Sequence, residues 1–351
     1  MEPRSRRRRL LTSGAAVVLA AAACAPPASD RHAAEFTGPS MGTIWTVKVV
    51  TATGGLDQAT SRAIDRGIRD QLARIDQLMS TWDDGSELSR FNQSTDLEPF
   101  AIARETADVF RWAAAIAAET HGAFDPTVGP LVEAWGFGAA ADGTATPDEA
   151  TLERLRASVG MALVELDPDG AWARKRRPEI QVDFSAIAPG YAADRIAEDL
   201  EARGLTDFLI DVSGELVARG RNASDEPWQV AIERPQATGR AAVRVVPLVD
   251  RAMATSGDYR NFRDVDGQRL THILDPRTAR PIAHALASVT VIDDLAVRAD
   301  ALSTAMMVMG PAEAMSFAEH EGIPALFLIR LPDGKFEERG TPAFAALDPR
   351  P

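Results

Sequence analysis

The chain has a single cysteine, Cys24, and this limits what can hold its fold together. With one thiol, no intramolecular disulfide can form. A metal site built from several thiolates is excluded for the same reason. Cys24 directly follows Ala22 and Ala23 and precedes the Pro- and Ala-rich segment APPASD. We therefore interpret this cysteine as a processing feature rather than as part of the folded domain.

Residues 1–23 have the three parts of an export signal: arginines from Arg4 to Arg9, an apolar stretch, and small residues before Cys24. The apolar stretch is too short to span a bilayer. SRRRRLL resembles the twin-arginine signal, although the general secretory route stays open. The position of Cys24 resembles a lipoprotein processing site, and the alternative is ordinary cleavage beside a cysteine without function. We expect a signal peptide over 1–23, a lipid-modified Cys24, and a tether over 24–38 that anchors the protein to the periplasmic face of the inner membrane.

The charge of the mature chain excludes one class of partner. The formal net charge is −13, and removal of residues 1–23 makes it more negative, because that segment holds five arginines and one glutamate. Such an acidic surface argues against nucleic-acid binding. The length favours one large α/β domain with a subdomain, or two domains.

Hydrophobic periodicity predicts the elements. Residues 43–51 alternate as in a strand, and apolar residues recur every three or four positions over 56–79, as in a helix of about six turns. The order of the remaining elements predicts an α/β fold with mixed, partly antiparallel sheets flanked by helices. We expect a helix near 101–119, strands near 161–166, 180–185, 207–213, 228–233, 242–249 and 286–293, and helices near 189–203, 298–309 and 311–320.

The segment ADALSTAMMVMG carries the clearest chemical pattern. Asp300 and Thr304 lie four residues apart on a strongly helical stretch, which puts a carboxylate and a hydroxyl side by side on one helix face. Hard oxygen ligands of this kind suit magnesium. The alternative is structural: Asp300 favours the positive helix N-terminus, and Thr304 bonds back to a carbonyl.

Three further segments combine turns with polar side chains. In THILDPRTARP, His272 lies just before a tight turn, where it can project into a cleft and take a proton from a hydroxyl. In GAFDPTVGP, Asp125 precedes a short helix that it can cap. In VDFSAIAPGYAADR, which contains Asp183, a strand passes into a helix through small residues, a geometry that exposes backbone groups to a phosphate or a metal. Each segment taken alone is also typical of an ordinary structural turn.

In their order along the chain, these segments resemble the ApbE family of FAD:protein FMN transferases. The resemblance covers almost the whole mature chain. Its motifs here are SMGTIWTVKV from Ser40, STWDDGSELSRFN from Ser80, GAFDPTVGPLVEAWGFG from Gly122, VDFSAIAPGYAADR from Val182, ATSGDYRNF from Ala254, HILDPRTARP from His272 and SVTVIDDLAVRADALSTAMMVMG from Ser288.

The resemblance implies a bilobed, T-fold-related domain over 39–351 with FAD in its cleft. It implies a magnesium ion held by the backbone carbonyl of Ala186 and the side chains of Asp300 and Thr304, with His272 as the general base. The residues that it implies around FAD are Met41, Trp82, Ala123, Phe124, Asp125, Asp183 and Leu274.

The activity that the resemblance implies is magnesium-dependent transfer of FMN from FAD to a threonine or serine hydroxyl of an acceptor flavoprotein, with release of AMP. The acceptor would be a subunit of a membrane redox complex. Two alternatives remain open at this stage. One is an FAD pyrophosphatase that gives FMN and AMP, and the other is a lipoprotein that binds FAD without turnover.

Three positions depart from the family pattern. Pro189 replaces a lysine expected near the phosphates, Ala279 replaces the glycine of DPxTG, and Ser213 replaces the first glycine of a Gly-Gly pair before Glu215. Because proline is suited to the start of a helix, we expect the fold to tolerate Pro189 while a positive charge is lost. If either glycine normally takes a positive φ, we expect the local turn to differ here.

Overall fold

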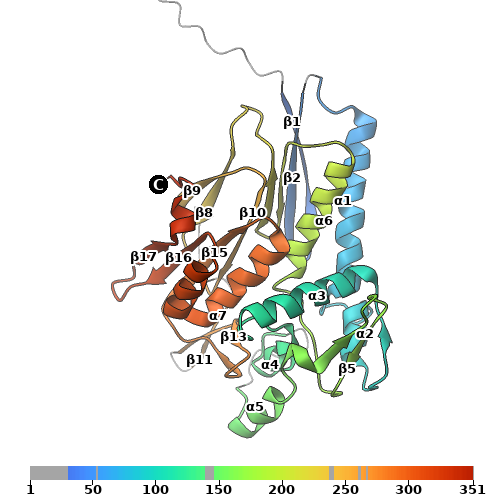
Figure 1. The fold of residues 1–351 in the computed structure, drawn as a ribbon, viewed down its shortest axis with the longest axis vertical. Helices are drawn as coiled ribbons and strands as arrows, with labels where there is room; N and C mark the ends of the chain where they lie inside the picture. Colours follow the sequence, from blue (N-terminus) through green and yellow to red (C-terminus); the bar gives the residue numbers. More distant parts are fainter. Residues whose placement is uncertain are drawn as a thin grey trace, which may run out of the picture.

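The computed structural model describes residues 31–350 except 53, 139–145, 237–240, 260–261 and 266–267. Its centre is an eight-stranded sheet in the order β1-β2-β6-β7-β10-β15-β16-β17, in which every neighbouring pair is antiparallel (Figure 1). The strands are β1 (His32–Ser40), β2 (Thr43–Thr51), β6 (Phe208–Val212), β7 (Glu215–Arg219), β10 (Arg251–Gly257), β15 (Leu286–Asp293), β16 (Ala325–Arg330) and β17 (Phe336–Gly340).

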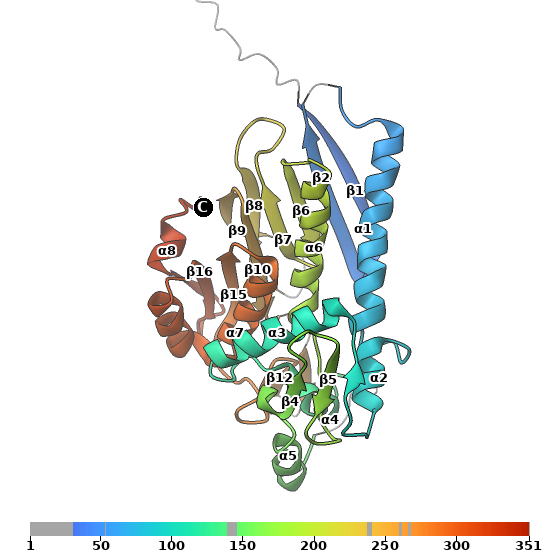
Figure 2. The ribbon, with the colours of Figure 1, turned by 45° about the vertical axis from the view of Figure 1, so that its right-hand side comes forward.

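Three long helices cover one face of this sheet: α1 (Gln58–Met79), α6 (Ala188–Ala202) and α7 (Ala296–His320) (Figures 1 and 2). The apolar stripe of α1, including Ile64, Ile68 and Leu72, is buried in the same core as the helix-facing residues of the sheet. This core is the largest of the molecule, so it holds the three helices in fixed positions relative to the strands.

The opposite face of the sheet is covered by the hairpin of β8 (Trp228–Glu233) and β9 (Ala242–Leu248) and by α8 (Pro342–Ala345). A separate apolar cluster fills this layer. Successive side chains of strand β7 point to opposite faces of the sheet and so belong to different clusters. Val217 lies in the cluster on the helix side, and Leu216 and Ala218 lie in the cluster on the hairpin side. Alternation therefore also places Glu215 on the helix side.

A second, smaller lobe lies at one end of the sheet (Figure 2). It is built mainly from residues 87–175, and two short hairpins from later in the chain pair within themselves nearby. Its elements are α2 (Glu87–Gln93), β3 (Phe100–Ala101), α3 (Arg104–Glu119), η1 (Pro126–Val128), α4 (Gly129–Ala134), α5 (Glu149–Arg156), η2 (Met161–Leu163), β4 (Val164–Leu166) and β5 (Trp172–Lys175). The two hairpins are β11 (Phe262–Val265) with β12 (Gln268–Thr271) and β13 (Leu274–Asp275) with β14 (Arg280–Pro281).

The α/β class with helix-flanked sheets is confirmed, as are the strand over 43–51 and the six-turn helix. The two helices expected near 298–309 and 311–320 form α7, which is kinked where Gly310 has non-helical dihedrals (φ 77°, ψ 175°). Pro311 follows and has no N–H to donate to the carbonyl of Met307. Instead, Nε2 of His284 lies 2.8 Å from that oxygen.

Two sequence expectations are wrong. Residues 180–185 form no strand, because the side chain of Asn92 bonds both backbone groups of Val182 at 2.8 Å in place of a neighbouring strand. The expected tether over 24–38 is a strand from His32 onward, paired with β2 over its whole length. Apolar and polar residues alternate only weakly along this edge strand, and for that reason its sequence resembles that of a linker.

The expected export signal and Cys24 lie outside the described residues. Among the helices that the structure does describe, none has the length and apolar character needed to cross a membrane.

Candidate active site

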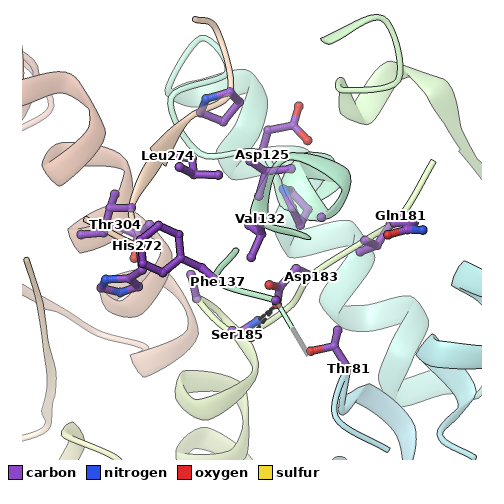
Figure 3. Close-up of a pocket in the computed structure, with 18 of the residues that line it drawn as sticks. Thr81, Asp125, Val132, Phe137, Gln181, Asp183, Ser185, His272, Leu274 and Thr304 are labelled. Atoms are coloured by element: carbon purple, nitrogen blue, oxygen red, sulfur yellow. Dashed lines mark hydrogen bonds between the residues drawn. The ribbon is translucent and has the colours of Figure 1, made fainter. Parts of the chain in front are cut away.

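A cavity of about 840 Å³ is lined by residues of the second lobe and by residues at the end of the large sheet. Its walls come from segments far apart in sequence. They include the loop after α1, the region from 123 to 138, the segment before α6, strands β7 and β10 of the large sheet, and helix α7. Figure 3 shows Asp125 and Val132 near the centre of the view and Thr304 of α7 at the left. A volume of this size falls in the range of pockets that hold cofactor-sized ligands.

The charged side chains of the wall are almost all acidic. They are the carboxylates of Asp84, Asp125, Glu133, Asp183, Glu215 and Asp300. Within the described ranges, no lysine or arginine side chain lines the cavity. Arg195 and Arg280, whose charges could in principle serve phosphates, form ion pairs with Glu198 and Glu149 outside it. An anionic ligand would therefore need a bound cation to offset the charge of the wall.

Helix α7 presents Asp300, Thr304 and Val308 to the cavity, spaced by four residues on one face. The Asp300 carboxylate is 4% exposed and accepts a hydrogen bond from the Gly190 amide at 3.1 Å. Burial raises the pKa of Asp300 to about 7, the Gly190 bond opposes that change, and the nearby charge of Asp194 adds to it. Such a carboxylate is costly to ionise until a cation reaches it.

A chain of hydroxyl groups connects Thr304 to its neighbours on α7 and β10. The Oγ atom of Ser256 in β10 lies 2.8 Å from Thr304 Oγ1 and 2.7 Å from Ser303 Oγ. Ser303 in turn donates to the backbone carbonyl of Asp300 at 2.9 Å. These bonds fix the rotamer of Thr304, so its oxygen keeps one position relative to Asp300.

The backbone of Ala186 supplies another oxygen. Helix α6 begins after Ile187, whose dihedrals (φ −156°, ψ −30°) are not helical. In a longer helix the Gly190 amide would donate to the Ala186 carbonyl, but it donates to Asp300 instead. The Ala186 carbonyl thus lacks its intrahelical donor beside the carboxylate. A carboxylate, a hydroxyl and a carbonyl together are the hard oxygen donors that magnesium prefers.

Glu215 also reaches the cavity, and sequence reasoning named it only as the neighbour of an altered turn. The residue is 9% exposed, and its Oε2 atom is buried with no hydrogen-bond partner among the described residues. Burial raises the pKa of Glu215 well above its usual value, and the charges of Asp300 and Asp211 add to the effect. An acid at the first position of a strand, directly after a two-residue turn, was the signal available in the sequence.

His272 lies between β12 and β13 and is half-buried in the cavity wall. Its ring meets that of Phe137 edge to face, with centroids 6.5 Å apart and an interplanar angle of 65° (Figure 3). Arg263 stacks over Phe137 with its guanidinium carbon 4.8 Å from the ring centroid. Phe137 therefore restricts the orientation of the histidine ring.

The two aspartates expected around FAD are anchored by their own loops. Asp125 Oδ1 accepts from the Thr127 amide at 2.9 Å and the Thr127 hydroxyl at 2.6 Å, and its Oδ2 accepts from the Met161 amide at 3.0 Å. Burial raises the pKa of Asp125, and these bonds oppose the rise. Asp183 Oδ1 accepts from the amide and hydroxyl of Ser185 at 2.8 and 2.5 Å (Figure 3).

The fold brings most of the expected site residues to this one cavity. Trp82 lies at its rim and is 73% exposed. Met41 is the exception, because it occupies the β1–β2 turn (φ 51°) and packs against the main core instead of lining the cavity. The residues that do line it are Trp82, Ala123, Phe124, Asp125, Asp183, Ala186, His272, Leu274, Asp300 and Thr304.

Comparison with known proteins gives one consistent family. Residues 41–327 match the ApbE family. The chain is 40% identical over 319 residues to the FAD:protein FMN transferase of Vibrio cholerae, covering 91% of this chain and 92% of that protein. It is 37% identical to the protein of the same name from Escherichia coli K12, with 90% of each chain covered.

Solved structures agree with this assignment. The flavin transferase ApbE from Vibrio cholerae superposes with a TM-score of 0.81 at 37% identity, covering 90% of this chain and 99% of that one. The apo form of the flavinyl transferase ApbE from Pseudomonas stutzeri gives a TM-score of 0.82 at 36% identity, covering 90% and 97%.

Proposed function

Because this chain belongs to the ApbE family, we propose that it is an FAD:protein FMN transferase that uses magnesium to move FMN from FAD to a hydroxyl side chain of an acceptor flavoprotein. The observation that carries the proposal is the cavity itself. It combines buried oxygen donors on α7 and before α6 with a histidine and with room for a dinucleotide.

The charges of the cavity favour a metal-dependent reaction. The pyrophosphate of FAD is anionic, and the described wall offers carboxylates but no lysine or arginine. Asp300, Thr304 and the Ala186 carbonyl would hold the magnesium ion. When bound there, magnesium neutralises charge on the phosphate oxygens and makes AMP a better leaving group.

The remaining chemistry falls to the protein side chains. We assign His272 as the base that takes the proton from the acceptor threonine or serine hydroxyl. The hydroxyl oxygen then bonds to the phosphorus of the FMN half, and the bond from that phosphorus to the bridging oxygen breaks, so that AMP leaves. Phe137 positions His272 for this step by holding its ring edge to face. The rigid Asp125 and Asp183 loops shape the pocket for the flavin nucleotide.

Two other outcomes remain as alternatives to transfer. In an FAD pyrophosphatase, water replaces the protein hydroxyl, and FMN and AMP are both released. In a binding lipoprotein, FAD stays intact, and the replacement of the family lysine by Pro189 is the feature that favours it. The coexistence of Asp300, Thr304 and His272 in one cavity argues against pure binding, because binding does not require that set.

We place the protein at the outer face of the inner membrane, as a lipoprotein anchored through Cys24. The export signal and the cysteine after two alanines support this location. An acceptor subunit of a membrane redox complex would then lie on the same surface as the enzyme.

The proposal is tested by incubating the purified protein with FAD, magnesium and candidate acceptor domains and then measuring intact acceptor masses. Transfer predicts a gain equal to FMN joined through a phosphoester to one threonine or serine. An unmodified acceptor accompanied by free FMN and AMP would favour the pyrophosphatase, and intact FAD would favour binding alone.

A further inference from the structure

Glu215 is directed into the active-site cavity by the turn that precedes it. Ser213 (φ 65°) and Gly214 (φ 109°) form a two-residue turn between β6 and β7, and Val212 pairs with Glu215 across it. Positive φ at both central positions is the pattern of a type I′ hairpin, which matches the twist of the strands. The Gly214 amide also donates to Asp211 Oδ1 at 3.0 Å. The turn is thus well fixed, and alternation along β7 puts Glu215 on the side of α7.

One oxygen of Glu215 lacks the partner that a buried acid requires. More than nine-tenths of the residue is buried, yet within the described part of the chain Oε2 accepts no hydrogen bond. Among the charged groups that raise the pKa of Glu215, Asp300 has the larger effect, and it is another buried carboxylate on the same cavity wall. Buried carboxylates are normally paired with a cation or coordinate a metal. No lysine or arginine of the described wall fills that role.

We propose that Glu215 is an additional ligand of the cation held by Asp300 and Thr304, so that two carboxylates from different elements, β7 and α7, share one metal ion. This inference deepens the proposed function, because it concerns the same metal centre. No described group of three or more acidic, histidine or cysteine side chains is arranged to hold a metal. The centre therefore depends on these two acids together with neutral oxygens.

Two carboxylates balance the charge of one divalent ion, and this has a consequence for the order of binding. The metal should bind in the absence of FAD, because the protein alone neutralises it. If Asp300 were the single carboxylate of the centre, the phosphate oxygens of FAD would be needed to balance the remaining positive charge of the metal ion. Loss of Glu215 should therefore convert FAD-independent metal binding into FAD-dependent binding.

The test uses Mn²⁺ as the probe and Glu215→Gln as the variant, because glutamine keeps the shape and removes the charge. Calorimetric titration of the metal-free protein without FAD should give at least about tenfold weaker Mn²⁺ binding for the variant. Glu98→Gln, which changes an exposed acid that does not line the cavity, is the matched control and should bind Mn²⁺ as wild type does. Mn²⁺ should also raise the Tm of Glu215→Gln less than it raises the Tm of wild type, because the variant has lost one ligand of the ion.

Equal Mn²⁺ affinities for wild type and Glu215→Gln would overturn the proposal, as would a wild-type protein that binds no Mn²⁺ without FAD. If Glu215→Gln fails to fold, Glu215→Asp keeps the charge but withdraws the oxygens by one methylene. It should bind Mn²⁺ more weakly than wild type, and wild-type affinity in that variant would also overturn the proposal. Because these titrations contain no FAD or acceptor, a failure of FMN transfer leaves their outcome unaffected.

Discussion

At the scale of single residues, the burial of Asp300 links the fold to the chemistry. A carboxylate with a pKa raised to about 7 is destabilising when ionised in the metal-free protein, and a bound cation reverses that preference. Among the described residues, the Gly190 amide donates the hydrogen bond that the Asp300 carboxylate accepts, and Asp300 also lines the cavity, where a cation can reach it.

The first prediction follows from this environment. Asp300→Asn should remove one anionic ligand and abolish most FMN transfer while the fold is retained, because the amide fills the same space. Thr304→Val should reduce transfer less, since a neutral hydroxyl contributes less to a hard cation than a carboxylate does. Transfer rates measured across a magnesium titration check this. Identical titration curves for wild type and Asp300→Asn would contradict the assigned centre.

Pro189 is the second residue whose role can be tested. It lies in the first turn of α6 and is half-buried, as expected for a proline near the start of a helix, and it does not line the cavity. Pro189→Lys should restore a cation near the phosphates and tighten FAD binding, by up to about fivefold for a partly screened charge of order 1 kcal/mol. It should also lower the free energy of unfolding by up to about 1 kcal/mol.

Parallel FAD titrations and denaturant unfolding of the Pro189→Lys variant measure the two effects. If Pro189→Lys tightens FAD binding and lowers the free energy of unfolding, then proline at this position gives up a charge that would help to bind FAD and makes the backbone more rigid. If FAD binding is unchanged or weaker in this variant, then a lysine at position 189 does not assist FAD binding in this protein as the family pattern implies.

At the scale of elements, the close crossing of α6 and α7 sets the geometry of the metal centre. A Cβ atom on Gly190 would lie 2.4 Å from the Ala296 carbonyl oxygen and 2.9 Å from Asp300 Cβ. Asp194 of α6 strengthens the same contact, because its carboxylate accepts the amides of Ala296 and Val297 at 2.9 Å at the start of α7. The two helices are therefore fixed at the point where Asp300 enters the cavity.

The third prediction tests that crossing. Gly190→Ala should separate the helices, lower the free energy of unfolding by about 1–3 kcal/mol through overpacking, and weaken Mg²⁺ binding by displacing Asp300. Gly67→Ala on α1 is the control, because the atoms nearest to its Cβ would be the ends of two partly exposed side chains, Arg203 Nη2 at 2.9 Å and Asp199 Oδ2 at 3.1 Å, and not a backbone carbonyl. That change should be neutral or stabilising by up to about 1 kcal/mol, since alanine favours a helix interior. Equal stability and equal Mg²⁺ affinity for the Gly190→Ala variant and wild type would count against a tight crossing.

The altered turns show where sequence reasoning about elements reached its limit. We expected the turns at Ser213 and Ala279 to differ if the family glycines adopt positive φ. Both residues instead take left-handed conformations themselves, with φ of 65° and 62°. Non-glycine residues tolerate such φ values at a cost of about 1–2 kcal/mol, and Trp135 Nε1 donates to the Ala279 carbonyl at 2.9 Å to hold that turn. Sequence alone does not reveal these compensating contacts.

Long amphipathic elements were predictable, and locally ambiguous ones were not. The 3.6-residue period of α1 and the kink after Met309 in α7 could be read from the chain. The extended segment at 180–185 could not be distinguished from a strand, because its partner is the side chain of Asn92, about ninety residues away. Strand β1 was missed because an edge strand with mostly exposed residues carries little periodicity.

At the scale of the whole molecule, the site exists only where the two lobes meet. Its motifs were recognisable in sequence because each lies at a turn or a helix start. That they converge on one anionic cavity depends on long-range pairing of strands and helices, which local patterns do not contain. For this reason Glu215 was not identified from the sequence, and the position of Met41 against the main core was not foreseen.

The fourth prediction concerns how the whole molecule is held at the membrane. Cys24 lies outside the described residues, and seven residues, 25–31, separate it in sequence from the first strand, β1. The protein purified from membranes should partition into detergent, and Cys24→Ser should release it, because one or more acyl chains provide the anchor. Detergent phase separation followed by immunoblotting measures this. A Cys24→Ser variant that stays equally membrane-bound would contradict the lipoprotein assignment.

The central claim is that one magnesium-dependent centre couples the cleavage of FAD to attachment of FMN on an acceptor. The most direct measurement quantifies AMP released and FMN covalently bound to the acceptor in the same reaction, for wild type and for Asp300→Asn. The account predicts one AMP for each FMN attached, and loss of both products in the variant. AMP released well in excess of attached FMN, or product formation unaffected by Asp300→Asn, would contradict it.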